Sequence, residues 1–460
     1  MATPSDPWLE RLLSSAATTI STGPAPIGSA HGLFVARGSG RPLADLLGLQ
    51  QVHEQRDLWP DELTAVYGRP PLALAEEALG MPLLTALATA FYYYGATMQH
   101  PPVNTALALE PPARVLQVAP GAVEAFLDRF ASTADELAAA AEANRSDWAN
   151  LHLQERPLRR LGDRAIVLDE AFLLERVTTG LFFLVLEHEG RVGGEAASQQ
   201  WRDAYAQMHE LLVEDYLKGF APHSFGGETL VFDEDDLRLA YDPKNRGGGR
   251  ADLGIDYGSS VLLADAVSGQ LSIATRQDGD KAAFTRDIQQ LVVKKARQLA
   301  GTVEKVTRDP QPAGAPLSAP ATAVRTVVVP GGQFPVNPVT TRFIDEQLRA
   351  DPTSAAMLND PRVLGLQVLD LRDLEHAEAV RARDHRTLPE LLRAWQADPR
   401  YAQVSLSDWL IATGTVTDAD LLRPRLLTGP LEEVFAAVEE LLIPPDERLP
   451  QHRPAEPASD

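Results

Sequence analysis

A predicted β-hairpin at residues 251–267 constrains the fold of this chain more than any other feature. Two short aliphatic segments, 251–255 and 261–267, flank the sequence Asp256-Tyr257-Gly258-Ser259. Asp, Gly and Ser are typical turn residues, and two apolar segments joined by such a turn favour an antiparallel strand pair. The sequence therefore predicts two adjacent strands in the middle of the chain.

The segments around this hairpin alternate between helical and strand patterns. Helices are predicted over residues 201–220 and 284–299, and β-branched strands over 324–329 and 363–369. Further helices are predicted over 341–349 and 371–382, and two more begin at Thr387 and Pro430. The order helix, hairpin, helix, strand, helix, strand is typical of an α/β or α+β fold with a mixed sheet flanked by helices.

The region before the hairpin is predicted to be mainly helical. With 460 residues the chain is too long for one core, so two or three domains are expected. Residues 72–91 and 120–148 are Ala-rich and predict helices, and residues 165–168 predict a strand. Residues 181–186 fit a buried strand or a short helix equally well, and 189–194 predict a turn.

Composition excludes several kinds of chemistry. The chain has no cysteine, which rules out disulfides, thiolate zinc sites and a cysteine nucleophile, and which suits a cytoplasmic protein. Its formal net charge of −22 repels nucleic acid at long range. A role on nucleic acid therefore needs a local basic strip or a protein partner that supplies one.

Neither export nor membrane insertion is expected from the sequence. The first residues include Asp6 and Glu10 and lack the basic-then-apolar pattern of a signal peptide. The longest strongly apolar stretch, residues 181–186, is far shorter than the ~20 residues that span a bilayer. We expect a cytoplasmic protein without membrane association.

Familiar catalytic motifs are missing. The sequence has no GxxxxGK[ST], no GxSxG and no GxGxxG after a predicted strand. His209 and Glu210 begin like the helix of a zinc protease, but Val213 stands where the second histidine is required. A single histidine cannot hold zinc on one helix face, so this motif is rejected.

Three carboxylates fall in an order that carries a resemblance. Glu214 lies on the predicted helix 201–220, Asp252 on the first hairpin strand, and Asp265 near the end of the second. This order, followed by a helix with lysines, resembles the PD-(D/E)xK phosphodiesterase superfamily, which includes restriction endonucleases and many repair nucleases. The resemblance covers residues 201–410 and implies a restriction-endonuclease-like α/β domain.

The resemblance also implies a chemistry and a set of roles. In such sites carboxylates at one sheet edge hold Mg²⁺, which takes oxygen ligands and activates water against a phosphate. Asp252 and Asp265 match the two strand carboxylates, and Glu214 matches the helix glutamate that orients metal or water. The implied activity is Mg²⁺-dependent hydrolysis of nucleic acid, with DNA as the expected partner.

The lysine of the motif is displaced. The family has lysine two positions after the second carboxylate, where this chain has Val267. A register slipped by one would put Ala266 in the carboxylate position and Ser268 in the lysine position, which fits worse. On a helical wheel, however, Lys295 falls in the middle of the apolar stripe of the helix 284–299, flanked by Lys294 and Gln298. Since some members of the superfamily carry the catalytic lysine on this helix, Lys295 is the first candidate and Lys294 the second.

These inferences divide the chain into four parts. We expect a mainly helical domain at 1–195 and the restriction-endonuclease-like domain at 196–415, with a Pro/Ala-rich loop at 309–322. A C-terminal helical segment at 416–442 and a disordered tail at 443–460 follow.

Other interpretations use the same residues. Aspartates are ordinary turn residues, so Asp252 and Asp256 also suit a purely structural role, and residues 247–249 form either a flexible turn or a backbone approach to phosphate. A second interpretation keeps the fold with an inactive site, as an interaction or regulatory subunit in bacterial defence or DNA processing. A third is an unrelated α/β binding protein with incidental carboxylates.

Overall fold

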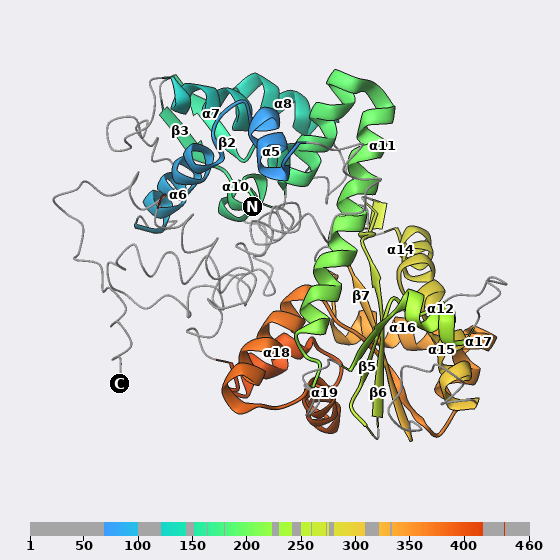
Figure 1. The fold of residues 1–460 in the computed structure, drawn as a ribbon. Helices are drawn as coiled ribbons and strands as arrows, with labels where there is room; N and C mark the ends of the chain where they lie inside the picture. The colour runs from blue at the N-terminus through green and yellow to red at the C-terminus, as the bar shows by residue number, and fades with distance from the viewer. Residues whose placement is uncertain are drawn as a thin grey trace, which may run out of the picture.

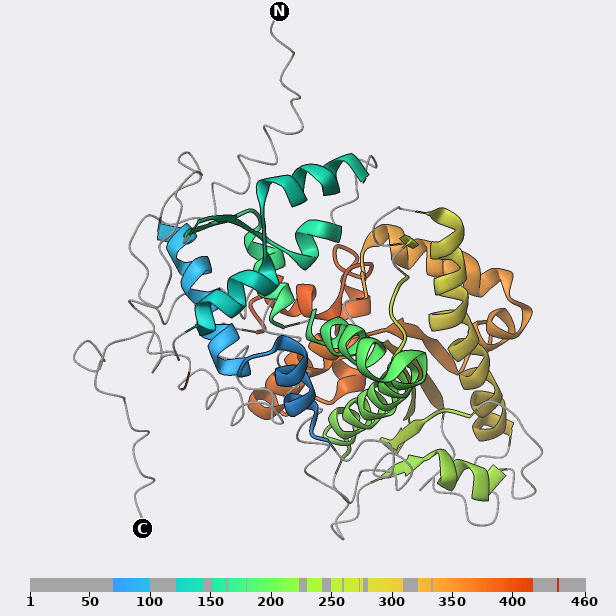
Figure 2. The same cartoon turned by 90° about the horizontal axis from the view of Figure 1, so that it is seen from above.

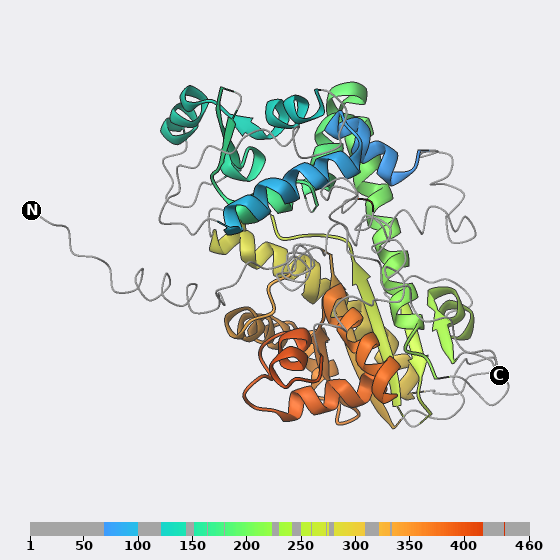
Figure 3. The same cartoon turned by 90° about the vertical axis from the view of Figure 1, so that its left-hand side faces the viewer.

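The fold was obtained as a computed structural model and is shown in Figures 1, 2 and 3. The structure describes residues 69–416 and residue 437. Within that range, residues 100–120, 144–150, 163, 179, 223–229, 242–249, 259, 273, 276–279, 309–321 and 332–333 are not described.

A five-stranded mixed sheet organises the second half of the molecule (Figure 1). Its strands lie side by side in chain order: β4 (Val231–Asp233), β5 (Leu253–Asp256), β6 (Ser260–Val267), β7 (Ala323–Pro330) and β8 (Val363–Val368). Strand β5 is antiparallel to β4 and β6, whereas β6, β7 and β8 are parallel. The start of β5 therefore meets the carboxyl ends of the parallel strands, where α/β sheets usually bind ligands.

Helices cover both faces of this sheet because its strands alternate apolar side chains between two cores. Leu262, Ala264 and Ala266 face one core, and Val261 and Leu263 face the other. On the first face lie α11 (Gly180–Lys218), α18 (Leu371–Asp384), α19 (Leu388–Ala397) and α20 (Leu406–Ala412). On the second face lie α12 (Glu234–Tyr241), α14 (Lys281–Ile288), the π-helical turn η4 (Gln289–Val293), α15 (Lys294–Arg308), α16 (Pro338–Ala350) and α17 (Pro352–Leu358).

The N-terminal elements pack around one end of α11 (Figures 1 and 3). They comprise α5 (Pro71–Leu79), α6 (Leu83–Gln99), α7 (Ala122–Phe130), α8 (Ala134–Ala143), α9 (Leu151–Glu155) and α10 (Glu170–Arg176). A small sheet of β1 (Ala131–Ser132), β2 (Leu158–Leu161) and β3 (Arg164–Val167) lies among them. Seen from above, these elements lie to one side of α11 and the large sheet to the other (Figure 2). One apolar cluster nevertheless extends from Leu74 in α5 to Val416.

Helix α11 decides between the two alternatives for residues 181–186 and corrects the turn expected at 189–194. Residues 181–186 are helical, and the predicted turn at 189–194 is reduced to Gly194, whose φ of 76° reverses the chain between two helical arms. Trp201 Nε1 donates to the carbonyl of Phe182 (3.1 Å), and Ser198 Oγ to that of Leu186 (3.1 Å), so the arms are tied together. These contacts between distant turns override the local turn pattern.

The helices predicted over 72–91 and 120–148 are each divided in two, because α5 ends at Leu79 before α6 begins at Leu83, and β1 separates α7 from α8. The other predicted elements are either confirmed or untested. The hairpin, the strands near 165, 324 and 363, and the helices near 201, 284, 341, 371 and 387 are all present, so a mixed α/β architecture is confirmed. Residues 247–249, most of the loop 309–322, the helix expected at Pro430 and the tail 443–460 lie outside the described residues. The expected domain limit at 195 falls beside the reversal at Gly194.

Within the described ranges no single helix combines the length and apolar character needed to cross a membrane. Helix α5 and the first part of α6 reach that composition only together, and they are bent by 60° relative to each other.

Candidate active site

The β5–β6 hairpin brings Asp252 and Asp265 together. The register pairs Leu253 with Ala264, and one further step along it places Asp252 opposite Asp265. The backbone N–H of Asp252 donates to the carbonyl of Ala264 (3.1 Å), and Asp252 Oδ2 accepts the N–H of Ala266 (2.7 Å). Two carboxylates from adjacent strands therefore share the carboxyl-end edge of the sheet.

Lys295 joins this pair from helix α15. Its Nζ forms a direct ion pair with Asp265 Oδ1 and lies 3.8 Å from Asp252 Oδ2. The Asp265 side chain is completely buried, whereas 15% of the Lys295 side chain and 26% of that of Asp252 remain exposed. The three predicted residues thus meet at one partly open point. Lys294, the second candidate, is exposed.

A π-helical turn directly precedes helix α15, which carries Lys295. Turn η4 carries Leu291, Val292 and Val293 into the core, and α15 begins at Lys294. A π turn holds one residue more than an α turn, so it rotates the following helix relative to the preceding one. Such insertions are rare and often occur at functional sites.

Val267 occupies the position where the resemblance expects lysine. Its side chain packs with the apolar residues of η4 and α14, on the same sheet face as Asp265. The strand position two residues after Asp265 therefore carries an apolar side chain, and the ammonium group that contacts Asp265 comes from helix α15 instead.

Helix α11 adds two glutamates near the aspartates. Glu214 forms an ion pair with Lys218 (3.2 Å), and burial raises its pKa. Glu210 lies one turn earlier, and burial together with nearby Asp252 raises its pKa to about 7, while Lys295 opposes the shift. Glu210 therefore lies within electrostatic range of both Asp252 and Lys295.

Sequence reasoning missed Glu210 as a site residue. In the sequence Glu210 belongs only to the rejected zinc-protease pattern, and the order of the carboxylates points to Glu214. The two glutamates lie four positions apart and therefore share one helix face. This spacing is the sequence signal that could have identified both. The structure directs Glu214 to Lys218 and sets Glu210 closer to Lys295.

The cluster carries too little positive charge for its carboxylates. Burial and Asp252 raise the pKa of Asp265 to about 9, against the opposing effect of Lys295. Burial lowers the pKa of Lys295, but Asp265 and Asp252 more than reverse this, so its net shift is upward. Both shifts mean that the group retains an extra proton near neutral pH, which a bound cation would displace.

The residues present suit a hard cation. Both oxygens of Asp265 are buried; Oδ1 is paired with Lys295, and Oδ2 has no hydrogen-bond partner among the residues that the structure describes. Carboxylate oxygens are the ligands that Mg²⁺ prefers. No three Asp, Glu or His side chains in the described ranges form a ready-made metal-binding group, since Lys295 lies between the two aspartates.

Asp256 serves the hairpin turn. Its Oδ1 accepts the N–H of Gly258 (2.7 Å), and Gly258 has a φ of 84°, as a tight turn requires. Its side chain is completely buried, which suits a structural part.

Comparisons of the chain with protein-family models, with curated proteins and with solved structures found no match.

Proposed function

We propose that this chain is a nuclease-like protein with a restriction-endonuclease-like domain, and that it hydrolyses phosphodiester bonds of nucleic acid with Mg²⁺. The order of α11, the β5–β6 hairpin, α15 and the parallel strand β7 supports the proposal, as does the mixed sheet flanked by helices. It is the order that the resemblance to the PD-(D/E)xK superfamily implies.

One observation carries the proposal: Lys295 Nζ lies against both Asp265 and Asp252. A lysine on an apolar helix face is costly unless it meets an anion, and here it meets two carboxylates from neighbouring strands. Two acids and one base at the carboxyl edge of a sheet are the groups that phosphodiester hydrolysis with a metal requires.

In this proposal Asp252 and Asp265 hold the cation. When bound, Mg²⁺ would polarise the phosphate and lower the pKa of the attacking water. Lys295 remains protonated and stabilises the additional negative charge on the phosphate oxygens in the transition state. Its ammonium group lies against Asp265 and is therefore already close to the proposed reaction centre.

Glu210 is the group best suited to take the proton of the attacking water. Its pKa of about 7 lies in the range where a carboxylate can both accept and release a proton. As the water oxygen bonds to phosphorus, its proton passes to Glu210. The phosphorus–oxygen ester bond breaks, and the leaving oxygen takes a proton from solvent. Glu214, paired with Lys218, would orient the metal or the water from the same helix.

The experiment is a cleavage assay on single- and double-stranded DNA with Mg²⁺ or Mn²⁺. We expect cleavage by the wild-type chain and at least about a hundredfold loss in Asp252→Ala, Asp265→Asn and Lys295→Ala. Lys281→Ala removes an exposed lysine on α14 and is the matched control, with activity retained. Cleavage that persists in Asp252→Ala would reject the site assignment.

A second candidate is an inactive nuclease fold that acts as an interaction or regulatory subunit. The net charge of −22 favours it, because such a field opposes binding of DNA without a partner. Absence of both cleavage and divalent-ion binding in the wild-type chain would select this candidate over the active nuclease.

A further inference from the structure

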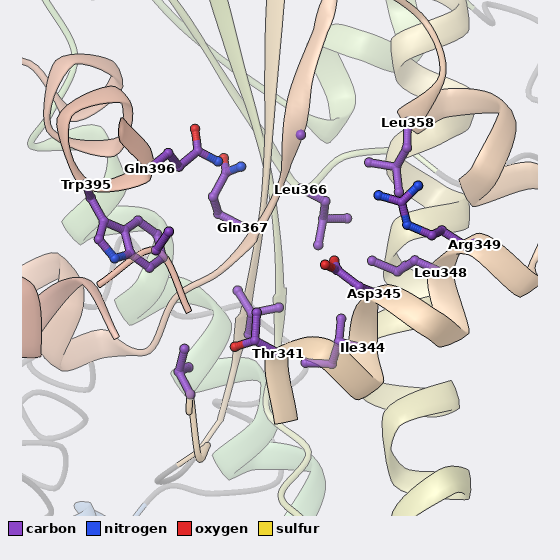
Figure 4. A pocket seen from close by; sticks show the side chains of 14 residues that line it. Thr341, Ile344, Asp345, Leu348, Arg349, Leu358, Leu366, Gln367, Trp395 and Gln396 are labelled. Atoms are coloured by element: carbon purple, nitrogen blue, oxygen red, sulfur yellow. The ribbon is translucent and has the colours of Figure 1, made fainter. Parts of the chain in front are cut away.

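A cavity of about 310 Å³ lies along the free edge of β8, away from the aspartate pair (Figure 4). It is near the lower limit of ligand pockets, ~300 Å³. Helix α16 contributes Ile344 and Leu348 to its wall, and α19 contributes Trp395 and Gln396. Strand β8 passes between these two walls, so the cavity is lined from both faces of the sheet.

Gln367 of β8 is an unsatisfied polar group in this cavity. Only 4% of the residue is exposed, and neither its Nε2 nor its Oε1 has a hydrogen-bond partner among the described residues. A buried amide without partners costs free energy, and most buried polar side chains in proteins are satisfied. The free donor and acceptor of Gln367 therefore point to a ligand that offers an acceptor and a donor in return.

A second amide is turned to the same place. Arg325 Nη1 donates to Gln396 Oε1 (2.9 Å), which leaves Gln396 Nε2 toward the cavity. Gly365 has a φ of 100°, and a Cβ at this position would lie 3.1 Å from Gln367 Nε2 and 3.7 Å from Gln396 Nε2, so both amide groups lie close to the backbone of Gly365. The amide groups of Gln367 and Gln396 therefore lie at the same part of β8, and both line the cavity.

The backbone of β8 offers further hydrogen bonds at this edge. Among the described strands β8 ends the sheet, with β7 on one side only. The N–H of Leu369 donates to the carbonyl of Val328 (3.0 Å), so residues 367 and 369 direct their backbone groups to β7. In a parallel ladder the alternate residues, Leu366 and Val368, then direct theirs to the open side.

The two faces of the cavity differ in chemistry. Leu366 of β8 faces Ile344 and Leu348 on one side, where Asp345 and Arg349 also line the cavity, and Gln367 faces Trp395 and Gln396 on the other side (Figure 4). Successive side chains of an extended peptide point alternately to opposite faces. A flat ring system would use only one of the two walls, whereas an added strand would use both.

We infer that the edge of β8 binds an extended peptide segment of a partner protein by strand addition. The backbone of the segment pairs with Leu366 and Val368, as in other cases of added strands. An asparagine or glutamine side chain of the segment exchanges hydrogen bonds with the amide of Gln367, and the apolar residues on either side of it fill the pocket at Ile344 and Leu348. This inference does not depend on the proposed nuclease activity.

The test uses a fluorescently labelled peptide, acetyl-SKVNVKS-amide, and versions with Leu or Phe for Val and Gln for Asn. We expect saturable anisotropy changes at concentrations below about 1 mM with the full chain for at least one of these peptides. Replacing the central Asn by Leu, or N-methylating the two Val residues, should weaken binding about tenfold or more.

The protein-side variant is Gln367→Leu, which keeps the size of the side chain and removes its amide. It should weaken binding about tenfold while raising the thermal unfolding midpoint, because an unsatisfied amide leaves the core. The exposed Gln403 supplies the control, Gln403→Leu, with unchanged binding. The inference is overturned if no peptide of the set binds, or if binding is indifferent to N-methylation and to the central Asn.

Discussion

Lys295 on α15 forms a direct ion pair with Asp265 on β6, whose side chain is completely buried. The pair joins the helix to the sheet at the edge where Asp252 also lies, 3.8 Å from the same ammonium group. A buried ion pair is expensive to form and still more expensive to break. The Lys295–Asp265 pair and Asp252 therefore form one partly buried cluster of three charged groups.

Replacing Lys295 should lower the free energy of unfolding much more than replacing the neighbouring Lys294. Lys295→Met leaves Asp265 buried without its counter-charge once the carboxyl group ionises, so we expect a loss of about 3–5 kcal/mol in the free energy of unfolding at about pH 10, above the Asp265 pKa of about 9. The loss should shrink toward acid pH, because a protonated Asp265 no longer needs the ammonium group. Lys294→Met, at an exposed position, should change stability by no more than ~0.5 kcal/mol. Urea denaturation measures both; equal effects of the two substitutions would contradict the burial of Lys295 against Asp265.

The raised pKa of Asp265 predicts a pH dependence of a definite sign. The folded state holds a proton on this carboxyl up to a pKa of about 9, whereas the unfolded chain releases it near 4. Folded protein thus binds more protons between these values, and stability should fall as the pH rises from about 4 to 9. Asp265→Asn should flatten this slope in denaturation curves recorded across the range. A slope unaltered by the substitution would place the titrating group elsewhere.

Glu210 should set the acid limb of the activity profile. With a pKa of about 7, it becomes ionised and able to accept a proton as the pH rises through neutrality, so the cleavage rate should rise over the same range. Glu210→Gln should lower the rate and remove this limb, while Asp203→Asn, on an exposed part of α11, should leave both unchanged. If Glu210→Gln kept the limb and Glu214→Gln lost it, the proton would belong to Glu214.

Gly254 should be indispensable to the hairpin without taking part in chemistry. A Cβ added to Gly254 would come within 1.9 Å of the Phe232 ring, because Phe232 of β4 is the cross-strand partner of Gly254. We expect Gly254→Ala to destabilise the fold by about 1–3 kcal/mol through overpacking. The double variant with Phe232→Leu should recover part of the loss in thermal denaturation. Additive losses would mean that the ring is not what excludes the methyl group.

The sequence predicted the hairpin and the meeting of its acids with Lys295 because both depend on short-range periodicity. Alternating apolar residues around a turn define two strands, and a lysine in an apolar stripe must approach whatever lies under that helix. Whether Asp252, Asp265, Lys295 and Glu214 act on phosphate stays a prediction.

Other features could not be predicted from the sequence because they depend on contacts between distant segments. The arm 180–193 of α11 is helical owing to its pairing with the second arm, and the π turn at 289–293 has no sequence pattern of its own. Glu210 required knowledge of which face of α11 meets Asp252. The cavity beside Gln367 arises between α16, β8 and α19, and local periodicity does not predict it.

The most direct test of the shared site is calorimetric titration of the full chain with Mn²⁺ near pH 7 in buffers of different ionisation enthalpy. We expect one saturable Mn²⁺ site and release of about one proton per ion, because the cation displaces the proton held by the aspartates. Both the binding and the proton release should be lost in Asp265→Asn. Absence of saturable binding, or binding that Asp265→Asn leaves unchanged, would contradict a cation site at Asp252, Asp265 and Lys295.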